Sequence, residues 1–212
     1  MKMVLASQNQ HKLEEMQEIL SAYGIEVVRE SDLGLSLTVE ETGTTFEENA
    51  LIKARAVMEA SGLPAIADDS GLCVDALNGA PGIYSARYGG PELDDPGRCR
   101  LLLENMRGMP DRRCRFVCAV CCAFPGGETV TALGECAGTL AYAPRGESGF
   151  GYDPIFFFPD LKKTFAELTP QEKHAVSHRG AALKCFQARL SAYLGRDAEG
   201  GPAENSGTIA PN

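Results

Sequence analysis

The spacing of apolar residues divides most of the chain into predicted helices and strands. Apolar side chains one helical turn apart predict helices in four segments: 8–24, 44–62, 96–108 and 169–195. Gly24 ends the first of them. Thr44 and Glu47 have the spacing of a capping box at the start of the second. Thr169, followed by Pro170, is the expected cap of the last, which we predict to be a single helix.

Shorter apolar runs between these helices predict strands. They cover residues 1–7, 25–30, 63–69, 113–124, 128–140 and 153–158. The segments 113–124 and 128–140 are joined across the turn residues Pro-Gly-Gly. We therefore predict that these two strands pair as a long antiparallel hairpin.

Length and composition indicate one domain and disfavour some classes of partner. At 212 residues the chain can bury one full-sized core, and we predict a single domain over residues 1–195. Residues 196–212 contain almost no apolar side chains, which predicts a disordered tail. With 20 basic against 29 acidic residues the net charge is −9, so a nucleic-acid polymer is an unfavourable partner. Because no segment approaches the roughly 20 apolar residues of a membrane span and no signal-peptide core is evident, we expect a cytoplasmic protein without a membrane partner.

The eight cysteines raise the question of disulfides or a metal site. Five of them lie in or beside the predicted hairpin: Cys114, Cys118, Cys121, Cys122 and Cys136. This placement is typical of reduced thiols in an apolar core rather than of a spaced disulfide framework. Cys118 and Cys121 form a C-x-x-C pair, but residues three apart on a strand face opposite sides of a sheet, and the sequence offers no second pair to complete a zinc site.

Two acidic pairs are candidates for a metal site. Asp68 and Asp69 follow a short apolar run, and we expect the strand to open there into a loop, at the edge of the sheet where ligands collect. Neighbouring carboxylates repel each other and need a cation, a shared proton or open water. Together with Glu40 and Glu41 in a second loop they can hold Mg²⁺, which takes one or two protein carboxylates plus substrate phosphates. Solvated loop charge and helix capping are the alternative interpretation.

Two groups of residues can bind phosphate. Residues 7–12, between the first predicted strand and helix, offer backbone N–H groups, the Ser7 hydroxyl, the Asn9 amide and the Lys12 ammonium. The segment is not a Walker A loop, and an ordinary helix N-terminus explains it as well. Lys53 falls on the apolar face of the second predicted helix, where it either extends to water or is brought to an acidic loop.

A third group of residues can bind a planar base. Phe150 lies in a glycine-flanked loop and can stack on such a base. Lys173, His178 and Arg179 offer hydrogen-bond donors to keto oxygens. An ordinary loop and a basic helix face are the alternative.

Five segments together resemble the inosine triphosphate pyrophosphatase family, whose members hydrolyse non-standard purine triphosphates such as ITP, dITP and XTP to the monophosphate and pyrophosphate. In family order they read LASQNQHKLEE, EETGTTFEENALIKARA, LPAIADDSGLCVDALNGAPGIYSARY, GFGYDPIF and AELTPQEKHAVSHRGAAL, and they span residues 3 to 190. The resemblance implies an α/β fold with an elongated mixed β-sheet flanked by helices, and two lobes with a central active-site cleft. It also implies Mg²⁺ as cofactor, a small-molecule nucleotide as substrate and a homodimer.

The resemblance implies roles for individual residues as well. Glu40 and Asp69 resemble the metal ligands, and Asp69 also the catalytic base. Lys53 resembles a catalytic phosphate ligand. Further substrate contacts are implied for Ser7, Gln8, Asn9, Gln10, His11, Lys12, Ser70, Phe150, Gly151, Tyr152, Asp153, Lys173, His178 and Arg179. Many family members have glycine at the positions of Gln8 and His11, so this loop departs from the family pattern.

Two other functions are consistent with parts of the sequence. A nucleotide-binding protein that does not hydrolyse its ligand could lose the acids and lysines, all of which are present here. A Maf-like pyrophosphatase acting on pyrimidine triphosphates is disfavoured by the segments SHRG and GFGYDP, which resemble those that read purines.

Overall fold

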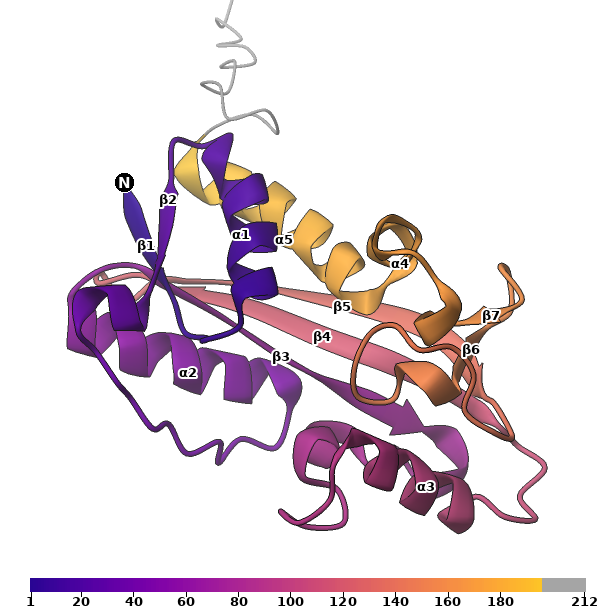
Figure 1. Cartoon of the computed structure of the whole chain (residues 1–212). Helices are drawn as coiled ribbons and strands as arrows, with labels where there is room; N and C mark the ends of the chain where they lie inside the picture. The colour runs from indigo at the N-terminus through magenta and orange to yellow at the C-terminus, as the bar shows by residue number, and fades with distance from the viewer. Residues whose placement is uncertain (196–212) are drawn as a thin grey trace, which may run out of the picture.

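The computed structural model describes residues 1–195, and these form one seven-stranded mixed sheet in the order β2-β1-β3-β4-β5-β6-β7 (Figure 1). β1, β2 and β3 are mutually parallel where they pair, and the later pairs are antiparallel. The strands are β1 Lys2–Leu5, β2 Glu26–Arg29, β3 Ala65–Val74, β4 Arg113–Ala123, β5 Thr129–Leu140, β6 Phe156–Phe158 and β7 Lys163–Thr164. The predicted hairpin is thus confirmed as β4 and β5.

Five α-helices flank this sheet in the described part of the chain: α1 Gln10–Ser21, α2 Phe46–Ser61, α3 Asp95–Asn105, α4 Pro170–Val176 and α5 His178–Leu194. Short 3₁₀ helices connect them: η1 Glu30–Leu33, η2 Asp75–Leu77, η3 Gly82–Arg87, η4 Asp153–Ile155 and η5 Phe165–Glu167. The predicted α/β class is confirmed. None of these helices is long and apolar enough to cross a membrane. The predicted tail, residues 196–212, lies outside the described residues.

Side chains of the central strands alternate between two faces and build two apolar layers. Ile66 and Cys118 lie on the face that packs against α1 and α5. Ala67 and Cys121 lie on the opposite face, against α2. The C-x-x-C cysteines therefore point away from each other, and all eight cysteines are free thiols, as the sequence predicted.

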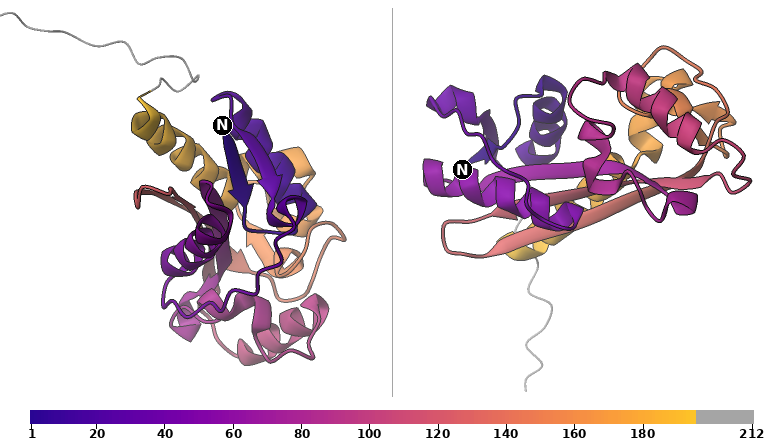
Figure 2. Two further views of the ribbon diagram at one scale, coloured as in Figure 1. Left: turned by 90° about the vertical axis from the view of Figure 1, so that its left-hand side faces the viewer. Right: turned by 90° about the horizontal axis from the view of Figure 1, so that it is seen from below.

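A third apolar cluster forms a second lobe at the far end of the sheet. Phe116, Phe156 and Phe165 are its centre, and Leu102 of α3 packs into it. The Phe116 and Phe156 rings are 4.6 Å apart between centroids. Figure 2 shows α3 and the segment 150–168 grouped away from β1 and β2. Two lobes thus share one sheet.

The acidic pair Asp68 and Asp69 lies inside β3, which corrects the predicted loop. β3 does not end at the acids because β4 pairs with it along its whole length, from Ala65 to Val74. β1, in contrast, pairs only with the first two residues of β3, Ala65 and Ile66. The edge of β3 that faces β1 is therefore not paired with β1 beyond Ile66. Asp68 and Asp69 lie where this pairing ends.

Gly71 lets the chain pack closely against that same edge. A Cβ atom at Gly71 would lie 2.3 Å from the Gly82 carbonyl oxygen and 2.5 Å from Ser85 Oγ. Ser85 Oγ also accepts a hydrogen bond from Leu72 N at 2.9 Å. This close contact seats η3, with its last residue Arg87, beside the acidic pair.

The N-terminus of α2 is capped one residue later than predicted. Thr45 is the cap, and its hydroxyl accepts a hydrogen bond from Glu48 N at 3.1 Å. The Glu48 carboxylate accepts in turn from Thr44 N at 2.6 Å. The run Thr-Thr-Phe-Glu-Glu contains two overlapping pairs with capping spacing, so the spacing alone does not select between them.

The predicted C-terminal helix is two helices that meet at Ser177. Ser177 is extended, with φ −76° and ψ 156°, and its hydroxyl accepts a hydrogen bond from Gly180 N at 3.1 Å. A Cβ atom at Gly180 would lie 2.1 Å from the His174 carbonyl oxygen. Ser177 thus ends α4 and caps α5, which starts α5 with His178 and Arg179.

Candidate active site

A pocket of about 640 Å³ lies between the two lobes, where β1 ends beside β3. Its wall is built by α1, α2, β3, the loop 148–153 and the junction of α4 and α5. It brings together most of the residues predicted from the sequence: Asn9, Lys12, Lys53, Asp69, Ser70, Phe150, Gly151, Tyr152, Asp153, Lys173, His178 and Arg179. Ser7, Gln8 and Glu40 do not line it, and the side chains of Gln10 and His11 lie outside what the structure describes.

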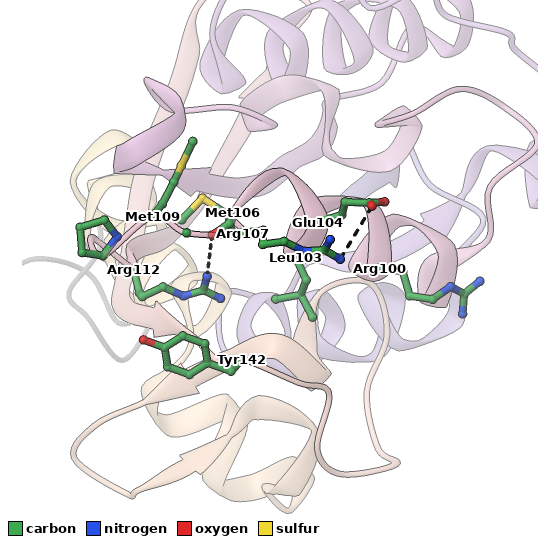
Figure 3. Close-up of a pocket in the computed structure, with 10 residues that line it drawn as sticks. Arg100, Leu103, Glu104, Met106, Arg107, Met109, Arg112 and Tyr142 are labelled. Atoms are coloured by element: carbon green, nitrogen blue, oxygen red, sulfur yellow. Dashed lines mark hydrogen bonds and ion pairs between the residues drawn. The ribbon is translucent and has the colours of Figure 1, made fainter.

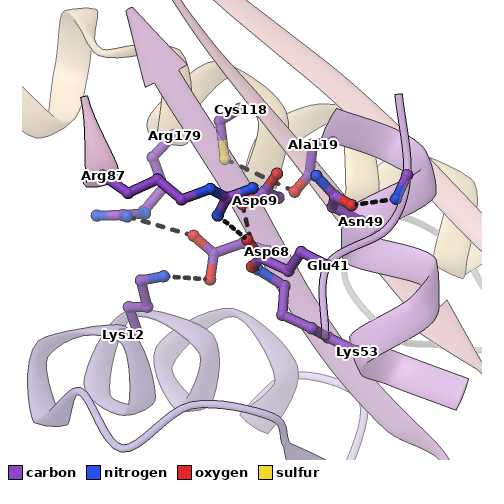
Figure 4. A network of polar contacts seen from close by, with 11 residues as sticks. Lys12, Glu41, Asn49, Lys53, Asp68, Asp69, Arg87, Cys118, Ala119 and Arg179 are labelled. Carbon is purple, nitrogen blue, oxygen red and sulfur yellow. Dashed lines mark hydrogen bonds and ion pairs between the residues drawn. The ribbon is translucent and has the colours of Figure 1, made fainter. Parts of the chain in front are cut away.

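Asp68 is fully buried on the face of β3 that meets α1 and α5. Lys12 Nζ lies 2.7 Å from Asp68 Oδ1, and Arg179 Nη2 lies 3.3 Å from Oδ2 (Figure 4). Burial alone raises the pKa of Asp68, but Lys12 and Arg179 outweigh it and hold this pKa at about 2. Asp68 is therefore a permanent anion that joins the two helices to β3.

Asp69 points to the other face of β3, toward α2. Lys53 Nζ lies 3.2 Å from Asp69 Oδ1 and 2.7 Å from Glu41 Oε1. Burial raises the pKa of Asp69, and the negative charge of Glu41 adds to the rise while Lys53 opposes it. Asp69 and Glu41 thus form a pair of carboxylates held by one ammonium group.

Lys53 reaches this acidic pair rather than open water. Its side chain is 19 % exposed. Burial lowers the pKa of Lys53, but Asp69 and Glu41 together raise it above its usual value. The sequence left open whether Lys53 extends to water or is brought to an acidic loop. The geometry matches the second of these.

Glu41, rather than Glu40, faces the pocket. Its two carboxylate oxygens contact Lys53 and, at 3.1 Å, Arg87 Nη1. These contacts outweigh the effect of burial and lower the pKa of Glu41. Glu40 is exposed and is not part of the pocket wall.

The loop 148–153 carries the aromatic end of the pocket. The Phe150 side chain is 60 % exposed, and Lys173 Nζ lies 4.7 Å from the centre of its ring. The Asp153 carboxylate accepts a hydrogen bond from Phe150 N at 2.9 Å and forms an ion pair with Lys173. The exposed ring is thus held in place by its own loop and is open to a planar ligand.

His178 forms the floor beside this loop. Its ring stacks on Phe116, with 4.7 Å between the centroids and 15° between the planes. Burial, reinforced by the charges of Arg179 and Lys173, lowers the pKa of His178 to about 3. A neutral imidazole offers one N–H donor and one acceptor, so it can take part in recognition without adding charge.

The start of α1 supplies the phosphate-binding candidates. Asn9 N donates to Ser7 Oγ at 3.2 Å, and Lys12 N donates to Asn9 Oδ1 at 3.3 Å. Gln8 Nε2 donates to Glu30 Oε1 at 2.7 Å, which directs the Gln8 amide to η1. Ser7 and Asn9 therefore shape the turn, while Lys12 extends into the pocket.

Comparison with known proteins places this architecture in a family. The model of the Ham1 family matches residues 3–189. The chain belongs to the Ham1 family. This confirms the family recognised from the five sequence segments.

Relatives of this Ham1-family chain are similar over nearly their whole length. A dITP/XTP pyrophosphatase of Exiguobacterium sp. is 49 % identical over 194 residues, which cover 92 % of this chain and 99 % of the relative. One of Haemophilus ducreyi is 51 % identical over 89 % of this chain and 98 % of its own. The solved Staphylococcus aureus Ham1 protein superposes with a TM-score of 0.86 at 44 % identity, over 91 % of this chain and all of that one.

Arg87 and Asp95 lie at this site of the Ham1-family chain but were not predicted from the sequence. Arg87 contacts Glu41, and Asp95 lines the pocket and accepts a hydrogen bond from Gly151 N at 2.7 Å. Arg87 lies within the specific segment GAPGIYSAR, so its sequence signal was available. Asp95 resembles an ordinary residue of a helix N-terminus, and only the tertiary structure shows what it holds.

A second hollow, of about 670 Å³, lies at the C-terminal end of α3 (Figure 3). Arg100, Arg107 and Arg112 are the cations of its wall. The Arg112 guanidinium donates to the carbonyl oxygens of Met106, Leu140 and Ala141. The Tyr142 ring lies 4.7 Å from this guanidinium. Arg112 thus satisfies carbonyl oxygens at the ends of α3 and β5. None of the predicted site residues lines this hollow.

Proposed function

We propose that this chain hydrolyses the non-standard purine triphosphates dITP, XTP and ITP to the nucleoside monophosphate and pyrophosphate, and so cleanses the nucleotide pool. One observation carries the proposal. This Ham1-family chain is about half identical to dITP/XTP pyrophosphatases. One end of its pocket carries lysines and paired carboxylates, and the other end carries an exposed aromatic ring and a neutral histidine. These ends suit a polyphosphate and a purine base, respectively.

The phosphate end is formed by cations from two helices. Lys12 of α1 and Lys53 of α2 both line the pocket. Residues 7–12 lead into the N-terminus of α1, where backbone N–H groups favour anions. We propose that Lys12 and Lys53 hold the triphosphate and stabilise the charge that develops when it is cleaved.

We propose Mg²⁺ as the cofactor, held by Asp69 and Glu41. The donor set fits this ion, because Mg²⁺ takes one or two protein carboxylates and completes its shell with water and phosphate oxygens. Both carboxylates approach the same ammonium group, and the raised pKa of Asp69 reflects burial and the neighbouring negative charge of Glu41, which a cation relieves. When bound, Mg²⁺ neutralises phosphate charge. The sequence predicted Glu40, and we propose Glu41 in its place because Glu41 faces the pocket.

Asp69 is the proposed catalytic base. Its carboxylate lines the pocket next to Lys53, which we propose holds the triphosphate, so an attacking water can donate a proton to it. The carboxylate takes a proton from the attacking water, whose oxygen bonds to the α-phosphorus. The α,β-phosphoanhydride bond breaks, and pyrophosphate leaves with the bonding electrons. Ser70, the next residue of β3, also lines the pocket and is a proposed substrate contact.

The base end distinguishes keto from amino purines. The proposed contacts are stacking on Phe150 and hydrogen bonds from Lys173, His178 and Arg179 to keto oxygens. Adenine presents an amino donor where inosine and xanthine present a keto acceptor. The donors of the protein would therefore face another donor and could not form these hydrogen bonds with adenine. Gly151, Tyr152 and Asp153 hold the loop that carries Phe150. Tyr152 does so by donating to the Ser85 carbonyl oxygen at 2.9 Å.

A panel of triphosphates tests the proposal. Pyrophosphate and monophosphate release is measured with Mg²⁺ for dITP, XTP, ITP, dATP, dGTP, CTP and UTP. We expect kcat/KM for dITP and XTP to exceed that for dATP by about 10² to 10⁴, because unmade hydrogen bonds at buried groups are costly. Similar values for dATP would overturn the selectivity. A preference for CTP or UTP would support a Maf-like activity, and binding without product would support a non-hydrolysing protein.

We also propose that the chain is a homodimer, as the resemblance implies. Light scattering should give twice the 22.7 kDa of one chain. A mass of one chain at micromolar concentration would contradict it. The cytoplasmic location stays a prediction from the sequence.

A further inference from the structure

Arg87, the last residue of η3, is a cation that none of the roles above uses. Its Nη1 donates to Glu41 Oε2 at 3.1 Å, while Lys53 Nζ contacts Oε1 of the same carboxylate at 2.7 Å (Figure 4). Both oxygens of Glu41 are therefore occupied by cations, at the position where we propose that the metal binds. A divalent cation bound to Glu41 would lie next to both of them, and their positive charges would repel it unless one moves away.

The two cations differ in how firmly they are held. Lys53 bridges Glu41 and Asp69 and is 19 % exposed. Arg87 contacts Glu41 alone in this cluster, is 44 % exposed and lies 5.2 Å from the centre of the Tyr84 ring. An exposed ion pair of this kind contributes little stability, because water solvates the separated charges well. Arg87 is thus the cation that can leave at small cost.

We infer that Arg87 competes with the divalent cation for Glu41, so that the metal enters the site together with the triphosphate rather than alone. The inference rests on the proposed function and its metal site. Glu41, Asp69, Lys53 and Arg87 carry no net charge together, so a bare dication would be added beside two positive side chains. A metal–triphosphate complex brings its own negative charge. Its phosphate oxygens also give the released guanidinium a new partner of matching geometry.

Binding of Mn²⁺ without nucleotide tests the competition directly. Free Mn²⁺ is measured by electron paramagnetic resonance at neutral pH in the wild-type chain and in Arg87→Gln. We expect Arg87→Gln to bind bare Mn²⁺ about three- to tenfold more tightly, because one repelling charge next to the site is gone. Arg87→Lys keeps the charge and should resemble the wild type. In a Glu41→Gln background the gain from Arg87→Gln should vanish.

Arg115 offers a matched control. It is also 44 % exposed, and it pairs with Asp75 at 3.2 Å and with Glu135 at 3.6 Å. Unlike Glu41, neither of these carboxylates lines the pocket. Arg115→Gln should leave Mn²⁺ binding unchanged. An equal gain in Arg115→Gln would show that only the net charge of the chain matters, and would overturn the inference.

Binding of a nucleotide should change in the opposite direction: the variant that binds bare Mn²⁺ more tightly should bind the nucleotide more weakly. The α,β-methylene analogue of ITP, which cannot be cleaved at that bond, is titrated with Mg²⁺ present. Arg87→Gln should bind it at least about threefold more weakly, since the guanidinium no longer meets the phosphates. Unchanged Mn²⁺ affinity in Arg87→Gln, or no Mn²⁺ binding by any variant at millimolar concentration, would overturn the inference. If the wild type still releases pyrophosphate from dITP, such a result overturns only the inference about Arg87. If the wild type releases no pyrophosphate, the proposed function itself is overturned.

Discussion

Asp68 and Asp69 are adjacent in the sequence but project from opposite faces of β3, into two different groups of cations. Asp68 contacts Lys12 and Arg179, at 2.7 and 3.3 Å, and its pKa is about 2. Asp69 contacts Lys53 at 3.2 Å, and burial raises its pKa. The pleat of one strand thus separates an anion that holds the site together from a carboxylate suited to proton transfer. The first two predictions follow from this separation.

Asp69→Asn should abolish most of the activity and leave the fold intact. The amide keeps the volume of the side chain but cannot accept a proton from water, so hydrolysis of dITP should fall by at least about a hundredfold. Stability should change by less than about 1 kcal/mol, because Lys53 keeps Glu41 as its partner and burial disfavours the charged form of Asp69. Steady-state kinetics and urea unfolding measure the two effects. Near-normal turnover in the folded variant would assign the base to another residue.

Asp68→Asn should instead destabilise the protein. Lys12 and Arg179 would be left beside a neutral group in a buried position, and loss of one partner of a buried ion pair costs about 3 kcal/mol. Asp111→Asn is the control, since its carboxylate also has a pKa of about 2 but lies at the surface with Arg113. Urea unfolding at pH 7 should show a lower free energy of unfolding for Asp68→Asn and an unchanged one for Asp111→Asn. Equal stability of both variants would mean that Asp68 does not anchor α1 and α5.

His178 should make stability depend on pH in the mildly acidic range. Its pKa is lowered to about 3 by burial, whereas an unfolded histidine titrates near 6.5. Between these values the unfolded chain binds a proton that the folded chain does not. The free energy of unfolding should therefore fall as the pH drops from about 6.5 toward 3, by up to about 1.4 kcal/mol per pH unit from this group.

His178→Gln removes this contribution and should flatten the dependence, measured by urea unfolding between pH 7 and 4.5. His174→Gln, at an exposed position of α4, is the control and should keep the wild-type slope. An unchanged wild-type slope in His178→Gln would show that His178 binds protons equally in the folded and unfolded states.

Asp95 should hold the loop that carries Phe150. Its Oδ2 accepts from Gly151 N at 2.7 Å, and its Oδ1 pairs with Arg98 at 3.2 Å. Asp95→Ala should loosen the loop and raise KM for dITP about three- to tenfold with little change in kcat, because an interaction with the bound substrate is weakened throughout the reaction.

Asp95→Asn keeps an acceptor for Gly151 and should restore part of the affinity. Asp94→Ala is the matched control: Asp94 caps α3 by accepting from Gly97 N at 2.8 Å, so its loss should cost about 1 kcal/mol of stability without changing KM. A KM that rises equally in Asp94→Ala would mean that the end of α3, rather than the contact to Gly151, positions the loop.

Local patterns of the sequence determined the elements of this protein. The long hairpin, the free cysteines and the helices were predicted because apolar periodicity, turn residues and strand alternation depend only on near neighbours along the chain. The family, and many of the residues that line the pocket, were recognised from segments such as DDSGL and SHRG. These features need no knowledge of which elements pack together.

Tertiary structure alone decided how the acidic residues are used. The sequence places Asp68 and Asp69 after an apolar run, and the expected loop was wrong because full-length pairing with β4 keeps both residues within β3. The break at Ser177 depends on the approach of Gly180 to the His174 carbonyl oxygen. Glu41 and Arg87 are 46 positions apart and meet only because η3 packs against the edge of β3 that β1 leaves open. Strand pairing, backbone approach and distant ion pairs depend on contacts between remote segments, which the order of residues does not display.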